Sequence, residues 1–166
     1  VAGAGDVNGD GFDDMLVGAT GAGREWDSIG AAYLVLGSTW PGSGSLAEAN
    51  AEYTGEAIGD YAGVAVSSAG DFDGDGLADI VVGAFRNEES GTEAGAAYLV
   101  LGSRSPAGES LTTADAQYTG PSGAVAGSVA SAGDVDSDGF ADLLVGAYKH
   151  DDGGTDAGAA YLIFGS

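Results

Sequence analysis

Three short acidic segments have the residue types and spacing of a cation-binding loop. Residues 6–14, 71–79 and 134–142 read DVNGDGFDD, DFDGDGLAD and DVDSDGFAD, so each carries oxygen-bearing side chains at its positions 1, 3, 5 and 9. The backbone carbonyl at position 7 can add another oxygen. Ca²⁺ takes about six to eight oxygen ligands in a flexible shell, and the glycine at position 6 permits the sharp turn that brings the donors together.

The segments therefore predict three Ca²⁺ sites, each with five residues as ligands. The side chains at positions 1, 3, 5 and 9 and the carbonyl at position 7 belong to Asp6, Asn8, Asp10, Phe12 and Asp14; to Asp71, Asp73, Asp75, Leu77 and Asp79; and to Asp134, Asp136, Asp138, Phe140 and Asp142. Mg²⁺ fits less well, because it demands a stricter octahedron and keeps its waters.

These segments are not EF-hands, which require a bidentate Glu at position 12 and flanking helices. Position 12 is Val17, Val82 or Val145 here, each inside an apolar run. The carboxylate at position 9 is therefore expected to close the metal shell. The alternative is a solvated acidic turn without metal, which three copies in register argue against.

The acidic segments belong to a longer internal repeat. The block GAAYLVLGS at residues 30–38 recurs at 95–103 and, as GAAYLIFGS, at 158–166. A further block, AEYTG at 51–55, returns as AQYTG at 116–120 and has no third copy. The chain is therefore expected to form one domain, residues 1–166, with repeats 1–62, 63–126 and 127–166, the last lacking its fourth strand.

Each repeat is predicted to be a meander of up to four antiparallel strands. Its short apolar runs suit strands and are too short for helices. The expected strands are a small-residue inner strand (1–5, 64–70, 129–133), a strand after the acidic loop (15–19, 80–84, 143–147), the GAAYL strand and the YTG strand. The predicted fold is all-β, with about two and three-quarter blades of a β-propeller.

Such a chain cannot close a propeller ring by itself, since rings have about four to eight blades. Further blades must come from a longer parent chain or from a homo-oligomer. Because Val1 begins inside a predicted strand, a piece of a longer chain is the favoured interpretation.

On these residues the chain resembles the FG-GAP repeats of the integrin α-subunit β-propeller and of bacterial extracellular proteins built from them. The resemblance covers essentially the whole chain and rests on the acidic segments, the Val-Gly-Ala that follows each, and Gly-Ala-Ala-Tyr-Leu. It implies a seven-bladed propeller, Ca²⁺ between the first two strands of a blade, a secreted or cell-surface setting, and adhesion or ligand recognition.

The chain departs from the family pattern at two places. The family's Phe-Gly pair appears as Ala-Gly at residues 62–63 and 126–127, and its Gly-Ala-Pro triplet ends in Thr20, Phe85 and Tyr148. Neither departure touches a predicted metal donor.

Composition excludes several classes of function. The chain has 26 Asp and Glu against 4 Lys and Arg, for a formal charge of -22, so binding to nucleic acid or to an anionic membrane surface is disfavoured. There is no cysteine, which excludes disulfides and thiolate metal sites. No apolar run is long enough to span a bilayer.

The loops expected opposite the acidic segments are candidates for recognition of a protein or glycan. Residues 20–29, 86–94 and 149–157 differ most between repeats, and they hold Trp26, Arg24, Arg86, Lys149 and His150. The alternative is that they are tolerant surface loops. Trp26 and Trp40 could stack on a ligand or cover a neighbouring core. The repeated tyrosines 33, 98, 161, 53 and 118 are expected to pack between blades.

The predicted function is a calcium-stabilised extracellular adhesion or ligand-binding scaffold rather than an enzyme. His150 is the only histidine and has no cysteine or second histidine to join it, and the chain has no nucleophile elbow or phosphate-binding glycine loop. No catalytic residue is assigned. The alternatives are part of a secreted propeller enzyme acting on polysaccharide, as hydrolase or lyase, and a ligand-free structural spacer.

Overall fold

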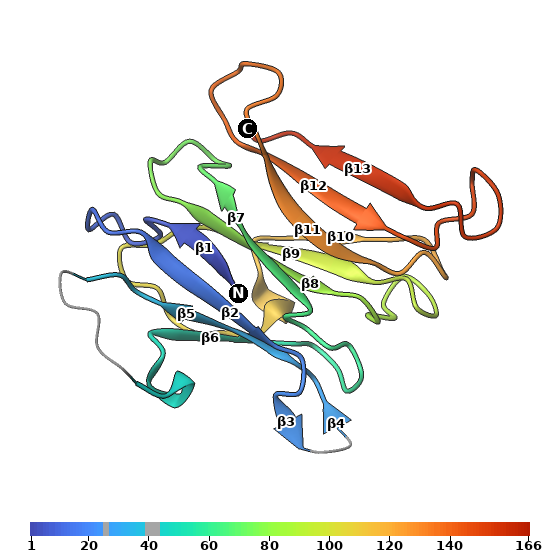
Figure 1. The fold of residues 1–166 in the computed structure, drawn as a ribbon, viewed down its shortest axis with the longest axis horizontal. Coiled ribbons are helices and arrows are strands. Elements are labelled where there is room, and N and C mark those ends of the chain that lie inside the picture. Colours follow the sequence, from blue (N-terminus) through green and yellow to red (C-terminus); the bar gives the residue numbers. More distant parts are fainter. Residues whose placement is uncertain (25–26, 39–43) are drawn as a thin grey trace.

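The computed structural model describes residues 1–24, 27–38 and 44–166, which form three antiparallel sheets (Figure 1). The first sheet contains β1 (Ala2–Gly5), β2 (Asp14–Ala19), β5 (Ala31–Val35) and β6 (Ala51–Thr54). The second contains β7 (Ala65–Gly70), β8 (Asp79–Ala84), β9 (Ala96–Val100) and β10 (Ala116–Thr119), and the third contains β11 (Ala126–Gly133), β12 (Asp142–Ala147) and β13 (Ala159–Ile163). The expected all-β partial propeller is confirmed.

The sheets share one register, because their sequences repeat. Val17 of β2 lies opposite Tyr33, Val82 of β8 opposite Tyr98, and Val145 of β12 opposite Tyr161. In each sheet the pairing of the first two strands also shifts at a glycine just before the acidic loop, at Gly5, Gly70 or Gly133. Such a bulge bends the strand locally, so every acidic loop leaves its sheet in the same direction.

The structure adds short elements that the sequence did not suggest. A hairpin of β3 (Gly23–Arg24) and β4 (Asp27–Ser28) lies in the first β2–β5 connection. Two 3₁₀ helices, η1 (Leu46–Glu48) and η2 (Leu111–Thr113), precede the fourth strands, and each is capped by a serine whose hydroxyl accepts a backbone N–H. β11 begins at Ala126, three residues before the expected start. No described helix is long and apolar enough to cross a membrane.

Glycines let the inner strands approach one another closely. β7 lies beside both β1 and β11. A Cβ at Gly18 would overlap the carbonyl oxygen of Gly63, and a Cβ at Gly83 would overlap that of Gly127. The N–H of Gly63 donates to the carbonyl oxygen of Gly83 at 2.9 Å. The glycines of the first two Val-Gly-Ala segments, Gly18 and Gly83, therefore set the distance between neighbouring sheets at the inner strands.

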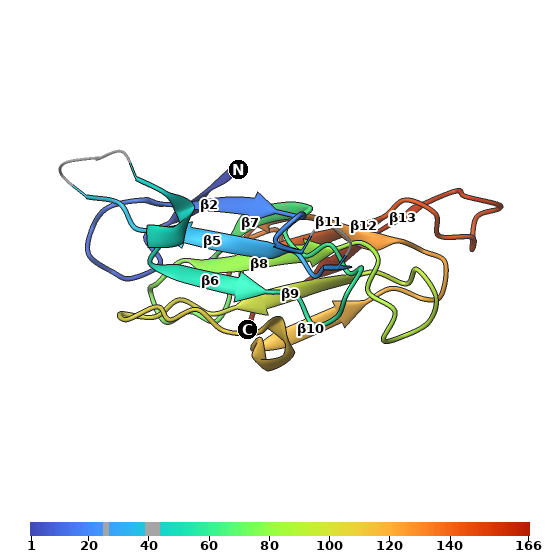
Figure 2. The same ribbon diagram turned by 90° about the horizontal axis from the view of Figure 1, so that it is seen from below.

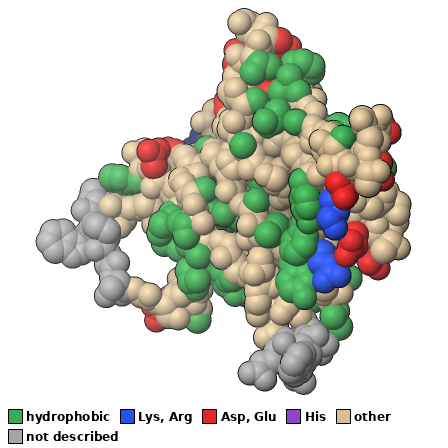
Figure 3. Space-filling view, turned by 45° about the vertical axis from the view of Figure 1, so that its right-hand side comes forward, with side chains coloured by type: hydrophobic (Ala, Val, Ile, Leu, Met, Phe, Trp, Pro, Cys, Tyr) green, Lys and Arg blue, Asp and Glu red, His purple; other side chains and the backbone are tan. Residues whose placement is uncertain are grey.

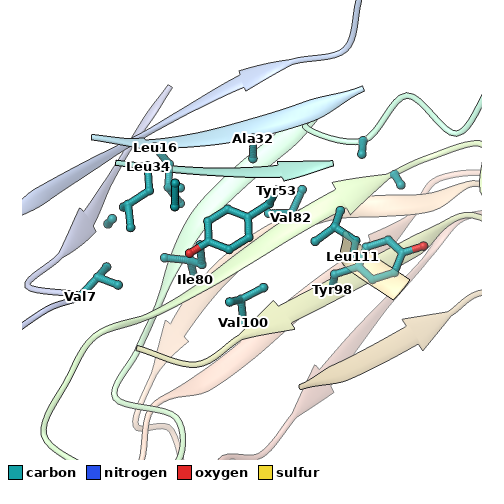
Figure 4. Close-up of a cluster of buried hydrophobic side chains, with 14 of the residues drawn as sticks. Val7, Leu16, Ala32, Leu34, Tyr53, Ile80, Val82, Tyr98, Val100 and Leu111 are labelled. Carbon is teal, nitrogen blue, oxygen red and sulfur yellow. The ribbon is translucent and has the colours of Figure 1, made fainter. Parts of the chain in front are cut away.

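Apolar side chains fill the space between the sheets, which lie face to face (Figure 2). Between the first two sheets, Leu16, Leu34 and Tyr53 pack against a group that includes Ile80 and Tyr98 (Figure 4). Tyr53 is 2% exposed and Tyr98 is fully buried, which confirms the expected packing role for these two tyrosines. Burial raises the pKa of the Tyr53 hydroxyl to about 12.

Between the second and third sheets the same arrangement recurs. Val81 and Leu99 from the second sheet pack with Leu143 and Val145 from the third. The second sheet thus packs one apolar face against the first sheet and the other against the third. Because both faces of the second sheet are covered, its strands β8 and β9 are buried at every position.

Gly83→Ala should destabilise the chain by about 3 kcal/mol, because the new Cβ would force two backbones apart in a packed region. Gly3→Ala is the matched control: it lies within β1, has ordinary backbone angles and has no atom within 4 Å of the added Cβ. Its effect should stay within about 0.5 kcal/mol. Urea denaturation measures both, and equal free energies of unfolding for the two variants would contradict this account of sheet spacing.

Candidate metal centres

The three acidic loops connect the first and second strands of their sheets: β1 to β2, β7 to β8, and β11 to β12. They are referred to below as loop 1 (residues 6–14), loop 2 (71–79) and loop 3 (134–142). Figure 2 shows loop 1 and the β9–β10 connection at one end of the strands, and the β8–β9 and β12–β13 connections at the other. The acidic loops therefore lie on one face of the molecule, as the antiparallel order requires.

Within each loop the oxygens at positions 1, 3 and 5 converge. Asp71, Asp73 and Asp75 each offer a carboxylate oxygen, and these oxygens lie within 4.8 Å of one another; Asp134, Asp136 and Asp138 do the same. In loop 1, Oδ1 of Asp6 and Oδ1 of Asn8 both accept the N–H of Asp10 at 3.0 Å. Loop 3 has this same shared donor, at 3.1 and 3.2 Å, so the two loops fold alike.

The glycine at position 6 fixes the turn. Its N–H donates to Oδ2 of the position 1 aspartate at 2.8 Å in loop 1, 3.1 Å in loop 2 and 3.0 Å in loop 3. Gly11, Gly76 and Gly139 have φ of 91°, 87° and 99°, a region that side chains other than glycine's rarely adopt. The sequence prediction for this glycine is confirmed.

The aspartate at position 9 has a role that the sequence did not reveal. Asp14, Asp79 and Asp142 are 3%, 0% and 0% exposed. In each, Oδ2 accepts the N–H of the position 2 residue at 2.7–2.8 Å. Oδ1 accepts the N–H of a glycine just beyond the third strand, at 2.7 Å for Asp14 and Asp79 and 3.0 Å for Asp142. The carboxylate thus ties the loop to the end of the third strand.

Position 9 is absent from the two convergent carboxylate groups found among the described residues. Each of its oxygens already accepts one N–H, and a carboxylate oxygen has a second lone pair. Its expected part in closing a metal shell stays a prediction. Burial raises the pKa of Asp79, and the two N–H donors oppose that rise.

The electrostatics of the loops suit a cation. Oδ1 of Asp71 is buried and has no hydrogen-bond partner, although the equivalent oxygens of Asp6 and Asp134 each accept an N–H. In loop 3, desolvation and then the charge of Asp138 raise the pKa of Asp136. Among the described residues Arg86 forms an ion pair with Glu93, and no lysine or arginine there forms an ion pair with a loop carboxylate. The donor set fits Ca²⁺.

A second polar cluster lies between the first and second sheets and was missed from the sequence. The side-chain N–H₂ group of Asn87 lies within hydrogen-bonding distance of Glu56 Oε2 (3.1 Å), Asp60 Oδ2 (3.3 Å) and the Tyr98 hydroxyl (3.0 Å). Asp60 is 3% exposed, and this burial raises the pKa of its carboxyl. The cluster borders a cavity of about 420 Å³ that Glu88 also lines. Asp60 has no counterpart in the next repeat, where Ala124 stands, so no repeated signal revealed it.

Arg86 and Lys149, two basic residues of the opposite loops, contact neighbouring side chains. Arg86 pairs with Glu93 at 3.1 Å and lies over the ring of Tyr61, and Lys149 lies over the ring of Tyr148. Figure 3 shows basic and acidic side chains next to each other beside a hydrophobic area.

The other residues singled out in these loops have no assigned chemistry. His150 is 9% exposed and meets the ring of Tyr161 edge-on. The backbone of Arg24 lies in β3. Trp26 and Trp40 lie outside the described residues, and their expected roles stay predictions.

The repeats that carry these loops match a known family. The sequence pattern of the FG-GAP repeat matches residues 1–35, 62–100 and 126–163, which is more than half of the chain. The chain belongs to the FG-GAP repeat family. Each matched FG-GAP repeat contains one acidic loop with the strands on either side of it.

Curated relatives of this FG-GAP chain include integrin alpha-IIb of Homo sapiens, 36% identical over 152 residues, and of Mus musculus, 35% identical. Both alignments cover 86% of this chain and 14% of the integrin. A phosphatidylinositol-glycan-specific phospholipase D of Dictyostelium discoideum is 30% identical over 97% of this chain and 19% of the relative. The chain thus spans less than a fifth of the length of these relatives.

In the second FG-GAP repeat, substitution at position 9 should destabilise the chain much more than substitution at position 5. Without metal, Asp79→Asn should lower the free energy of unfolding by about 2 kcal/mol. Both Asp79 oxygens accept a backbone N–H, and the Asn amide would place its N–H₂ donor beside one of these buried N–H donors. Asp75→Asn should change the free energy of unfolding by no more than about 0.5 kcal/mol, because Asp75 is exposed and the Asn side-chain oxygen can still accept the N–H of Leu77, while like-charge repulsion is lost. Urea unfolding in EDTA checks both, and a larger loss for Asp75→Asn would refute the structural role given to position 9.

Proposed function

We propose that this FG-GAP chain is a calcium-stabilised binding scaffold, a module of an extracellular adhesion or ligand-recognition protein. The observation that supports this most is the middle loop. There three carboxylates converge, and one of their oxygens, Oδ1 of Asp71, is buried without any partner. Burying a carboxylate oxygen costs free energy unless it has a partner. We take this partner to be a bound cation, because the same acidic spacing occurs in two further loops.

The loop residues would share the binding between them. Positions 1, 3 and 5 would supply side-chain oxygens, and position 7 (Phe12, Leu77 or Phe140) would supply its backbone carbonyl oxygen. Position 9 holds the loop against the third strand. Bound Ca²⁺ supplies positive charge that offsets repulsion between the carboxylates. Three ions would change the formal charge from -22 to -16.

The proposed setting is outside the cell. Calcium sites of extracellular modules have dissociation constants of about 10⁻⁴ to 10⁻³ M, so such sites fill only where calcium is abundant. The likeness to integrin alpha-IIb supports this setting and supports adhesion as the role. Recognition is assigned to the loops predicted for it from the sequence, residues 20–29, 86–94 and 149–157, whose ligand would be a protein or a glycan.

Further blades are proposed to cover the two outer faces of the chain. Leu144 and Leu162 are 41% and 42% exposed, although the residues at the same positions in the second sheet, Val81 and Leu99, are 0% and 3% exposed. On the opposite outer face Met15 is 43% exposed. The blades would come from a parent chain or from further copies of this one, and the number in the ring stays a prediction.

Removal of calcium should lower the melting temperature of the chain by about 10 °C or more, since ligands that bind only the folded state stabilise it by mass action. Differential scanning calorimetry in 10 mM CaCl₂ and in EDTA measures the shift. The variant Asp10→Asn/Asp75→Asn/Asp138→Asn is the control and should melt at one temperature in both buffers. Equal melting temperatures for the unsubstituted chain would exclude calcium stabilisation.

A second candidate function is that of an enzyme fragment acting on polysaccharide. The cavity beside Glu56 and Asp60 holds carboxyl groups outside the acidic loops, and one relative is named a phospholipase D. Release of reducing ends from a polysaccharide panel, lost in Glu56→Gln, would favour the enzyme. Calcium-dependent capture on a glycan and protein array without turnover would favour the scaffold. If both assays are negative, the structural spacer is the remaining alternative.

A further inference from the structure

Neighbouring acidic loops are joined by backbone hydrogen bonds. The carbonyl oxygen of Asp6, at position 1 of loop 1, accepts the N–H of Ala78, at position 8 of loop 2, at 3.0 Å. The carbonyl oxygen of Asp71 accepts the N–H of Ala141 in loop 3 in the same way, at 2.9 Å. Each hydrogen bond therefore starts at a position 1 residue, whose carboxylate is a proposed calcium ligand of its own loop. It ends at a position 8 residue of the next loop, which stands between the proposed ligands at positions 7 and 9.

Side chains make a second link between the same loops. A Cβ at Gly9 would lie 2.8 Å from Cδ2 of Leu77, and a Cβ at Gly74 would overlap the ring of Phe140. The position 7 side chain of each loop thus rests on the position 4 glycine of the loop before it. Phe12, at position 7 of loop 1, has no preceding acidic loop among the described residues and is 39% exposed.

These links connect the donor sets themselves. Position 7 contributes its carbonyl to its own loop and its side chain to the neighbouring loop. Position 1 contributes its carboxylate to its own loop and its carbonyl to the neighbour. An ion that orders one loop would therefore also order the groups of the next loop that contact it. A second ion bound to that next loop would then lose less conformational entropy. Coupling of this kind acts equally in both directions.

We infer that the three loops bind calcium with positive cooperativity along the row, with loop 2 coupled to both neighbours and loops 1 and 3 not coupled to each other directly. This inference rests on the proposed calcium function. The buried, unpartnered Oδ1 of Asp71 lies in loop 2, the loop that is linked on both sides.

Electrostatics oppose this coupling, because an ion in one loop reduces the negative potential at the next. This effect is screened by salt, with a Debye length of about 10 Å at 0.1 M that falls to about 3 Å at 1 M. Contact between packed groups is not screened in this way. A measurement in 0.5 M KCl therefore reports mainly the contact-mediated part.

The test follows calcium binding at each loop separately in the 166-residue chain. In ¹⁵N-labelled protein, the N–H groups of Gly11, Gly76 and Gly139 each donate to the position 1 carboxylate of their own loop, so their resonances report on that loop. Asp10→Asn, Asp75→Asn and Asp138→Asn weaken one loop each at the same position. With coupling, Asp75→Asn lowers affinity about fivefold at both loops 1 and 3, and Asp10→Asn lowers it at loop 2 more than at loop 3.

A second pair of variants changes the link without changing charge. Phe140→Ala removes the side chain that rests on Gly74, and Phe12→Ala removes the equivalent side chain where no preceding loop is present. Phe140→Ala should lower affinity at loop 2, whereas Phe12→Ala should leave loops 2 and 3 unchanged. Circular dichroism confirms that each variant is folded.

The outcomes separate the two proposals. If calcium shifts none of the three glycine resonances in the unsubstituted chain, the calcium function itself fails. If all three loops fill but each Asp→Asn variant affects only its own loop, and Phe140→Ala behaves like Phe12→Ala, the sites are independent and the inference of coupling is overturned.

Discussion

Repulsion between carboxylates is the constraint on which this structure depends. Each acidic loop gathers oxygens of like charge at the end of a sheet, and backbone N–H groups, rather than basic side chains, hold them there among the described residues. Such an arrangement raises the free energy of the folded chain unless a cation offsets it. If the loops bind calcium as proposed, they would link the stability of the chain to the calcium level of its surroundings.

Close packing of the sheets places the loops in a row. Gly83 permits the second sheet to approach Gly127 of the third, and Gly18 does the same toward Gly63. Apolar residues such as Leu16 and Tyr98 then fill the wider space between the sheets. With this spacing, the carbonyl oxygens of Asp6 and Asp71 reach the next loop. The close approach that glycine permits at the inner strands thus allows backbone hydrogen bonds to form between neighbouring acidic loops.

The strands, the loop positions and the turn glycine were predictable from the repeated sequence, whereas features that depend on tertiary contacts or on a local cap were not. Three copies of the acidic segment and of Gly-Ala-Ala-Tyr-Leu defined the strands, the loop positions and the turn glycine. The hydrogen bonds of Asp79 to Phe72 and Gly102 depend on tertiary contact, so spacing suggested only a metal donor there. Asp60 is buried through its contact with Asn87, 27 residues away, and the short η2 depends on the local cap of Ser110. The repeat shows where residues recur, but it does not show which contacts they make.

A crystal structure of the chain grown in CaCl₂, with anomalous scattering measured at long wavelength, tests the central claim most directly. The account predicts one anomalous peak in each acidic loop, roughly 2.3–2.6 Å from the side-chain oxygens of positions 1, 3 and 5 and from the position 7 carbonyl. Loops without a peak, with the oxygens of Asp71, Asp73 and Asp75 turned apart toward solvent, would contradict it.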